Sequence, residues 1–130
     1  MSVRRSLGIL QLLIGIGAVP AGVGLVLDPS GAGLGFDIRW LEASPFRDFL
    51  FPGLFLLIVN GLGNLLGSVA SFRGWRQAGN LGLALGILLV LWILLQVHWI
   101  GLGSWLQPAY FVFGLAECAL AAFVRRSEAS

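Results

Sequence analysis

Four long apolar stretches are the feature that most constrains how this chain of 130 residues can fold. A helix needs roughly 20 mostly apolar residues to cross a hydrocarbon core of about 30 Å. Charged residues make up 11% of the chain, whereas a soluble domain carries roughly 25%. A transmembrane barrel would instead show alternating segments of about ten residues. The sequence therefore predicts an all-α, four-transmembrane-helix bundle in one integral membrane domain, residues 1–130, with spans at Leu7 to Leu27, Phe49 to Phe72, Ala78 to Ile100 and Leu106 to Val124.

The arginines predict how the bundle is oriented, because positive charge accumulates at the cytoplasmic ends of spans. With four crossings, three arginine pairs fall on one side, and four acids and two arginines fall on the other. We therefore expect a multi-pass protein of the cell membrane with both termini inside (N-in/C-in). The basic residues predict contact with anionic membrane lipids, and they give no support for nucleic-acid binding. The inner residues are Arg4, Arg5, Arg73, Arg76, Arg125 and Arg126; the outer ones are Asp28, Asp37, Arg39, Glu42, Arg47 and Asp48.

The first outer connection, Asp28 to Asp48, is much longer than the other two connections. Ser44-Pro45 is typical of a helix start, with Ser as N-cap and Pro at the first helical position. The segment from Phe36 to Leu41 mixes Trp40 with charges, which predicts a short interfacial segment on the outer leaflet. Two interpretations of this connection stay open: a lid over a pocket mouth, or a plain connector with an aromatic anchor.

Glycines predict where the helices touch, because membrane helices associate through close packing of small residues. They form stripes in the first and third spans. These stripes exceed what one bundle would use on itself, which favours a homo-oligomer or packing against another membrane subunit. The predicted packing residues are Gly8, Gly15 and Gly22 in the first span, and Gly79, Gly82 and Gly86 in the third.

Glu117 is the only carboxylate inside a predicted span. A charged group near the bilayer centre is costly and normally faces the bundle interior with a partner. At about 1.5 Å per residue, Glu117 lies roughly 17 Å from the outer end, Asn60 about 13 Å and Asn64 about 19 Å. We expect the two amides to donate to Glu117, with an aromatic wall above it formed by Tyr110 and Phe113. Four roles remain open for this polar centre: a proton-accepting site in a transporter, an anchor in a lipophilic pocket, a contact to a partner helix, or polar glue between spans.

The remaining polar residues predict less. His98, the only histidine, lies near the outer end of the third span, where it could titrate or bind a headgroup, or simply be satisfied by water. One His and one Cys cannot form a Cys/His zinc site, and no catalytic constellation is present, so we expect a non-enzyme without a resident cofactor. Gln11, Gln77 and Asn80 are interpreted as residues at the inner membrane boundary.

One family resemblance comes from layout. Arg4-Arg5 precede a glycine-rich first span, a long outer loop follows, and Pro45-Phe46 leads into Pro52-Gly53-Leu54-Phe55-Leu56-Leu57. This order resembles the DoxX-like group of small four-helix membrane proteins. The resemblance implies a four-helix fold and, for some members, a role as a subunit beside quinone-linked oxidoreductases. It carries over no catalytic residue, and Asn60, Asn64 and Glu117 have no counterpart in it.

Two functions follow from the sequence. The first is a non-catalytic accessory or oligomeric subunit packed through glycine-rich helix faces. The second is a protein that binds a lipophilic ligand, such as a quinone or a lipid, or a small proton-coupled transporter. This second function would use Glu117, Asn60 and Asn64, with Tyr110 and His98 as further candidates.

Overall fold

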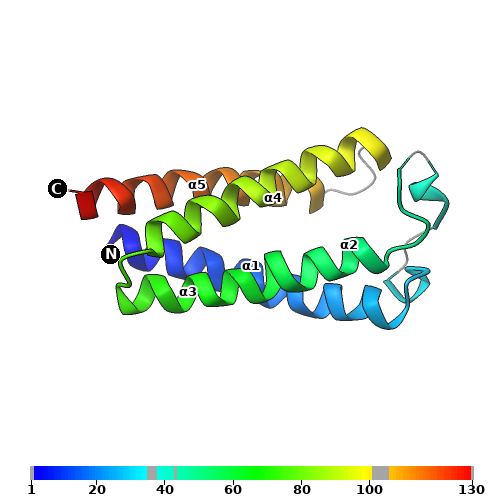
Figure 1. Cartoon of the computed structure of the whole chain (residues 1–130), viewed down its shortest axis with the longest axis horizontal. Helices are drawn as coiled ribbons and strands as arrows, with labels where there is room; N and C mark the ends of the chain where they lie inside the picture. Colours follow the sequence, from blue (N-terminus) through cyan, green and yellow to red (C-terminus); the bar gives the residue numbers. More distant parts are fainter. Residues whose placement is uncertain (1, 35–37, 43, 101–105, 130) are drawn as a thin grey trace.

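The computed structural model is helical throughout the regular elements of the residues that it describes, 2–34, 38–42, 44–100 and 106–129. Four helical rods are long and apolar enough to cross a membrane, which confirms the predicted fold class. Both termini lie at the same end of the bundle (Figure 1). The rods are α1 (Val3–Leu27); a second span made of α2 (Leu50–Phe55), η3 (Leu56–Gly63) and α3 (Asn64–Arg73); α4 (Ala78–Ile100); and α5 (Leu106–Ala129).

The four rods form two closely packed pairs (Figure 1). Helix α1 packs along the whole second span, and α4 packs along α5. The short link at Gly74, which takes a left-handed φ of 70°, brings α4 back beside α3. The α3–α4 contact is nevertheless much less extensive than the contacts within the pairs. Spans two and three, although neighbours in the chain, therefore make only a minor contact.

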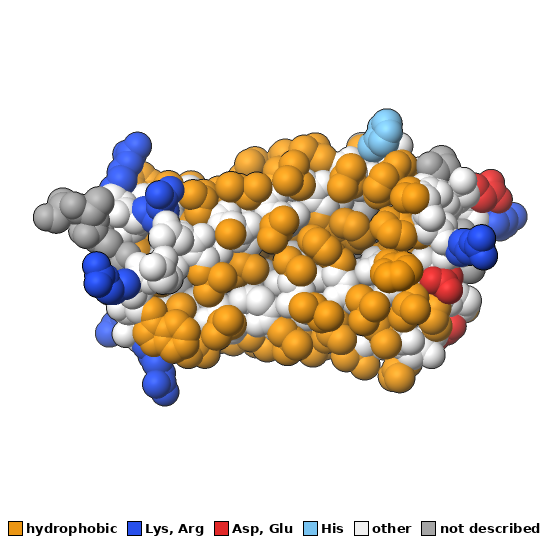
Figure 2. Space-filling model, viewed as in Figure 1, with side chains coloured by type: hydrophobic (Ala, Val, Ile, Leu, Met, Phe, Trp, Pro, Cys, Tyr) orange, Lys and Arg blue, Asp and Glu red, His pale blue; other side chains and the backbone are white. Residues whose placement is uncertain are grey.

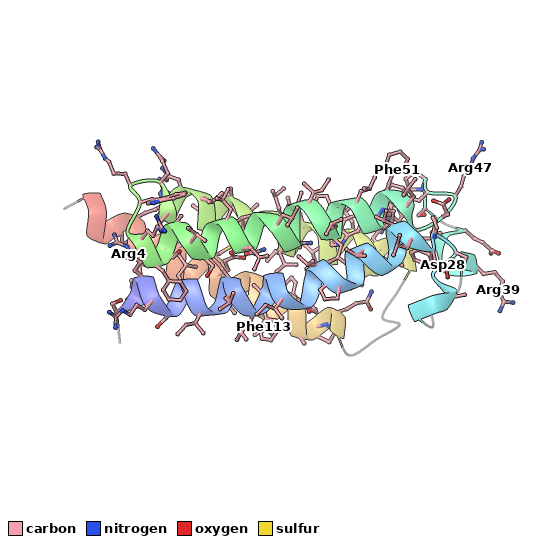
Figure 3. All side chains as sticks on the ribbon, turned by 90° about the horizontal axis from the view of Figure 1, so that it is seen from below. Arg4, Asp28, Arg39, Arg47, Phe51 and Phe113 are labelled. Atoms are coloured by element: carbon pink, nitrogen blue, oxygen red, sulfur yellow. The ribbon has the colours of Figure 1, made fainter. Side chains whose placement is uncertain are left out.

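Charged side chains gather at the two ends of the molecule, with an apolar band between them (Figure 2). We call the end with Arg4, Arg73 and Arg125 the arginine end. The opposite end carries Asp28 and the connection from 28 to 49, and we call it the loop end (Figure 3). This separation of arginines from the mostly acidic connection is the charge pattern from which the N-in/C-in orientation is predicted. The orientation itself stays a prediction.

The first connection folds inward over the loop end. It contains two short 3-10 helices, η1 (Ala32–Leu34) and η2 (Ile38–Leu41). Leu41 is 3% exposed and packs with Leu25 and Phe49. The Phe49 N–H donates to the Pro29 carbonyl at 2.8 Å, which ties the two ends of the connection together. Residues 35–37 and the Trp40 side chain lie outside the described structure, so the predicted interfacial segment is described only in part.

The second span begins later than the Ser44-Pro45 pattern predicts. Its first helix starts at Leu50, whose N–H donates to Asp48 Oδ1 at 3.0 Å. The Ser44 hydroxyl instead donates to the Leu41 carbonyl at 2.8 Å and accepts from the Phe46 N–H at 3.2 Å. Ser44 therefore stabilises a turn in the connection and does not cap a helix; the N-cap prediction was wrong because the same side-chain hydrogen bonds stabilise turns.

A π-helix interrupts the second span at Leu56–Gly63. Such i→i+5 segments are rare and occur frequently at functional sites. Asn60 lies in the middle of this segment and is 1% exposed. The π-helix thus marks Asn60, a buried amide of the second span, as a candidate functional residue.

Candidate ligand cavity and buried polar stripe

A partly open cavity of about 290 Å³ lies between the two helix pairs in the half of the bundle nearer the loop end. Helix α1 contributes small residues, Gly17, Ala18 and Ala21, to its wall. The connection contributes Leu41, Ser44, Phe46 and Phe49. The connection is therefore part of the cavity wall, and the plain-connector interpretation does not describe it fully. Most of the lining is apolar, which suits a lipophilic molecule.

Two aromatic pairs border this cavity. Trp92 of α4 stacks on Phe55 of α2, with ring centroids 4.6 Å apart and planes at 28°. Trp99, also in the wall, meets Phe46 of the connection edge to face at 5.7 Å and 88°. Trp92, Trp99 and Phe46 line the cavity, so a flat ring entering there would meet aromatic surfaces.

Asn60 is the lining residue with unused hydrogen-bonding groups. Both its Nδ2 and its Oδ1 are buried without a partner among the described residues. Its backbone carbonyl accepts from Asn64 Nδ2 at 2.9 Å, one helical turn further on. A buried amide without partners is costly. Asn60 is therefore suited to a ligand that presents both an acceptor and a donor.

Further polar lining comes from α4 and α5. Gln107 Nε2 lies 3.4 Å from Gln96 Oε1, at the edge of hydrogen-bonding distance. Tyr110 lines the cavity, and its hydroxyl lies so close to Gly17 that a Cβ there would be 2.7 Å away. His98, by contrast, is exposed and is not part of the cavity wall (Figure 2).

A stripe of buried polar side chains continues from Asn60 toward the arginine end, along the face of the second span that meets α1. The Ser68 hydroxyl donates to the Gly8 carbonyl at 2.8 Å. The Ser71 hydroxyl donates to Gln11 Oε1 at 2.8 Å. We call this set the polar stripe; its members are Gln11, Asn60, Asn64, Ser68, Ser71 and Glu117, each at most 4% exposed.

Glu117 reaches this stripe from α5. Its side chain is 0% exposed, and neither carboxyl oxygen has a hydrogen-bond partner in the described structure. The side chain that approaches it closely enough to interact is Gln11, whose Nε2 also lacks a partner in hydrogen-bonding geometry. The hydrogen bonds that the sequence predicted from Asn60 and Asn64 to Glu117 are not formed. The structure therefore brings Glu117 close to Gln11, which the sequence predicted to lie at the membrane boundary.

The spacing of Gln11 relative to two glycines is a sequence signal for its burial. Gln11 lies between Gly8 and Gly15 at spacings of three and four, on the glycine face of α1. A Cβ at Gly67 or Gly82 would lie 2.8 or 3.2 Å from Gln11 Nε2. Glycine at these two positions thus leaves room for the amide between the second and third spans.

Phe113 packs edge to face against Tyr110, with ring centroids 5.6 Å apart, but it does not form a buried wall above Glu117. Its side chain is 41% exposed and points away from the bundle (Figure 3). Gly114 takes its place on the buried face, where a Cβ would lie 2.8 Å from Val90 Cγ2. The one-residue difference arises because an interval of either three or four residues fits one helix face.

The predicted packing glycines all lie at contacts within the chain. Gly22 makes the closest approach to another backbone: a Cβ there would be 2.6 Å from the Leu57 backbone nitrogen. Each of these glycines packs against another part of the same chain, so the glycine stripes no longer support packing against a second copy of the chain. In the first span, Gly8, Gly15 and Gly22 face Phe72, Leu65 and Leu57; in the third, Gly79, Gly82 and Gly86 face Arg125, Ala121 and Cys118.

Within the described residues, no group of three His, Cys, Asp or Glu side chains could hold a metal ion. Comparison with known proteins finds no matching family model, no matching curated protein and no matching solved structure. The DoxX-like resemblance therefore stays a prediction, and the functional argument depends on the cavity and the polar stripe.

Proposed function

We propose that this small integral membrane protein binds a lipophilic molecule of the quinone class in the cavity at its loop end. The observation that carries the proposal is Asn60, whose amide has both hydrogen-bonding atoms unpartnered among the described residues, in a wall that is mostly apolar. A quinone ring offers carbonyl acceptors, and its reduced form offers hydroxyl donors, so one amide can bind either form.

The dimensions of the cavity support a ring-sized ligand group. Small-molecule sites usually enclose roughly 300–1,000 Å³, and this cavity holds about 290 Å³. We expect the ring to lie between the Trp92 and Trp99 walls and an attached hydrocarbon tail to extend into lipid. Ligands of this kind reach their sites through the bilayer, and they need no aqueous entrance.

The proposed orientation places this cavity in the outer half of the cell membrane. Six arginines at one end and a mostly acidic connection at the other have the asymmetry of the positive-inside rule. Both termini would then be cytoplasmic. The connection at the loop end would cover the cavity from the outside.

The alternative role is an accessory subunit or homo-oligomer. Its original support was a surplus of glycine faces, and the six glycines concerned all meet neighbours within the chain. An oligomer would have to use the lipid-facing side chains instead. A discrete oligomer or a co-purifying membrane subunit, with an empty cavity, would favour this role over ligand binding.

Purification in mild detergent tests the proposal. We expect an organic extract of the purified protein to contain a quinone, and a short-chain quinone to quench tryptophan fluorescence in a saturable manner. Asn60→Leu should weaken binding about three- to tenfold, since one hydrogen bond contributes roughly 0.5–1.5 kcal/mol. Asn80→Leu is the matched control, because Asn80 is exposed and bonds Gln77 at 2.7 Å. Equal affinity in both variants would contradict the role of Asn60.

A further inference from the structure

The polar stripe ends at a hollow on one side and at the cavity on the other. At the arginine end, Ser71 lines a hollow of about 520 Å³ together with Ser2, Arg4 and Arg5. At the opposite end of the stripe, Asn60 lines the ligand cavity. We propose that the stripe is a hydrated proton path that joins these two spaces, with Glu117 as its proton acceptor.

The first half of the path runs from Ser71 to Glu117. The hydrogen bond from the Ser71 hydroxyl to Gln11 Oε1 is 2.8 Å long. It turns Gln11 Nε2 away from Ser71, and the Gln11 side chain then approaches Glu117. Glycines at 67 and 82 leave the space that this amide occupies. Ser71 of α3 and Glu117 of α5 thus both approach the Gln11 side chain of α1.

The second half runs along the second span. Asn64 is one turn from Gly67, which borders Gln11 Nε2. Asn64 Oδ1 is buried and unpartnered, and Asn64 Nδ2 bonds the Asn60 carbonyl at 2.9 Å. Asn60 then faces the cavity. The amides cannot carry protons themselves, so their role is to hold and orient water molecules.

Unpartnered atoms distinguish this stripe from polar residues that only hold helices together through interhelical hydrogen bonds. Glue between spans would pair its donors and acceptors directly. Here six side-chain atoms lack partners among the described residues: Gln11 Nε2, Asn60 Nδ2, Asn60 Oδ1, Asn64 Oδ1 and both oxygens of Glu117. Such groups are costly in hydrocarbon, and a buried water makes about 2–4 hydrogen bonds to groups of this kind. We therefore infer that water occupies the stripe.

The proton balance of the path is simple. A hydronium at the arginine end passes its proton along water to a Glu117 carboxylate oxygen, which becomes a carboxylic acid. The acid later releases the same proton to water beside Asn64 and Asn60, and the carboxylate is restored. The step needs no oxidant or reductant.

Other titratable and charged groups lie beside the path or at its ends. Cys118 adjoins Glu117 on α5, and a Cβ at Gly86 of α4 would lie 2.7 Å from its sulfur. Among the described side chains, the remaining groups on the packed elements are Tyr110 of α5, in the cavity wall, and those at the ends of the bundle: Arg4 and Arg5 on α1, Arg73 on α3, His98 on α4, and Arg125 and Arg126 on α5.

Proton flux into vesicles tests the path without any ligand. The full chain is reconstituted into phosphatidylcholine–phosphatidylglycerol vesicles that contain a pH-sensitive dye, and a potassium gradient with valinomycin drives protons inward. We expect flux above that of protein-free vesicles, and we expect Glu117→Gln to lower it about tenfold or more. Glu42→Gln, at an exposed position of the connection, should leave it unchanged.

A second pair of variants keeps the test valid if Glu117→Gln does not fold. Asn64→Leu should reduce the flux, whereas Asn80→Leu should not. Wild-type flux equal to that of empty vesicles would overturn the proposal, as would full flux in Glu117→Gln or, if that variant does not fold, in Asn64→Leu. Quinone quenching of tryptophan is measured on the same samples, so failure of the proton path and failure of ligand binding remain distinguishable.

Discussion

The Ser71 hydroxyl donates a 2.8 Å hydrogen bond to the Gln11 side-chain carbonyl, joining α3 to α1 across 60 positions of sequence. Both side chains are 0% exposed. Apolar burial does not drive association between membrane helices, so close packing and contacts of this kind must hold the first helix pair together. The same bond orients the Gln11 amide toward Glu117.

A double-mutant cycle on this bond should give a favourable coupling between the two residues. Ser71→Ala, Gln11→Leu and the double variant are compared by unfolding in mixed detergents. We expect a coupling of about 0.6 kcal/mol and at most about 1.7 kcal/mol, the range known for interhelical hydrogen bonds. Ser6→Ala is the control, because its hydroxyl bonds the carbonyl of Ser2 in its own chain segment at 3.2 Å. Zero coupling would mean that the bond does not stabilise the pair.

The glycines of α1 should differ in sensitivity to alanine. At Gly22 a Cβ would meet backbone atoms of Leu57 at 2.6–2.7 Å, so the two spans must move apart. At Gly8 it would meet the Phe72 ring at 3.1 Å, and a side chain can adjust. We expect Gly22→Ala to lower the free energy of unfolding by about 1–3 kcal/mol, the usual effect of overpacking, and Gly8→Ala to lower it less. The reverse order would contradict the packing described for α1.

Acid should loosen the turn at the loop end. The Ser30 hydroxyl at 2.6 Å and the Gly33 N–H at 3.0 Å donate to Asp28 and hold the pKa of its carboxyl below its usual value of 3.8. Because the pKa is lowered in the folded state, the stabilisation is present above the unfolded pKa. It is lost as the pH falls through the folded value.

An NMR titration of the Asp28 carboxyl carbon tests this in wild type and in Ser30→Ala. We expect the variant to have the higher pKa, since Ser30 is the largest cause of the lowering. Hydrogen exchange at the Gly33 amide should accelerate on acidification in wild type. An Asp28 pKa that is identical in both proteins would show that the Ser30 bond does not form in solution.

The number and bounds of the membrane-spanning helices could be predicted from the sequence, because they depend on the length of the apolar segments. The predicted third span, Ala78 to Ile100, has the bounds of α4, and the predicted second span lies within one residue of its described ends at Leu50 and Arg73. Apolar runs of this length, ended by arginines, glycines and turn residues, leave little choice in hydrocarbon.

Two kinds of feature could not be predicted from the length of apolar runs: those for which one residue fits two local structures, and those that depend on contacts between helices. The Ser44 side chain can form hydrogen bonds with the backbone in a turn as readily as at a helix N-terminus, so the Ser44-Pro45 pattern did not specify which structure would form. The π-helix around Asn60 lies where the second span packs closely against α1: a Cβ at Gly61 would be 2.8 Å from Val19 Cγ2. The position of Gln11 near the end of the first span predicts a boundary residue, whereas the glycine face on which it lies is buried against the second span.

The most direct test of the account is to fill the cavity and measure quinone binding. Ala21 lines the cavity, whereas Ala84 is an exposed residue of α4. Tryptophan quenching by a short-chain quinone is measured in the wild type, Ala21→Phe and Ala84→Phe, all in the same mild detergent. The account predicts saturable quenching in the wild type and in Ala84→Phe, and its loss in Ala21→Phe. Undiminished saturable quenching in Ala21→Phe, or none in the wild type, would contradict it.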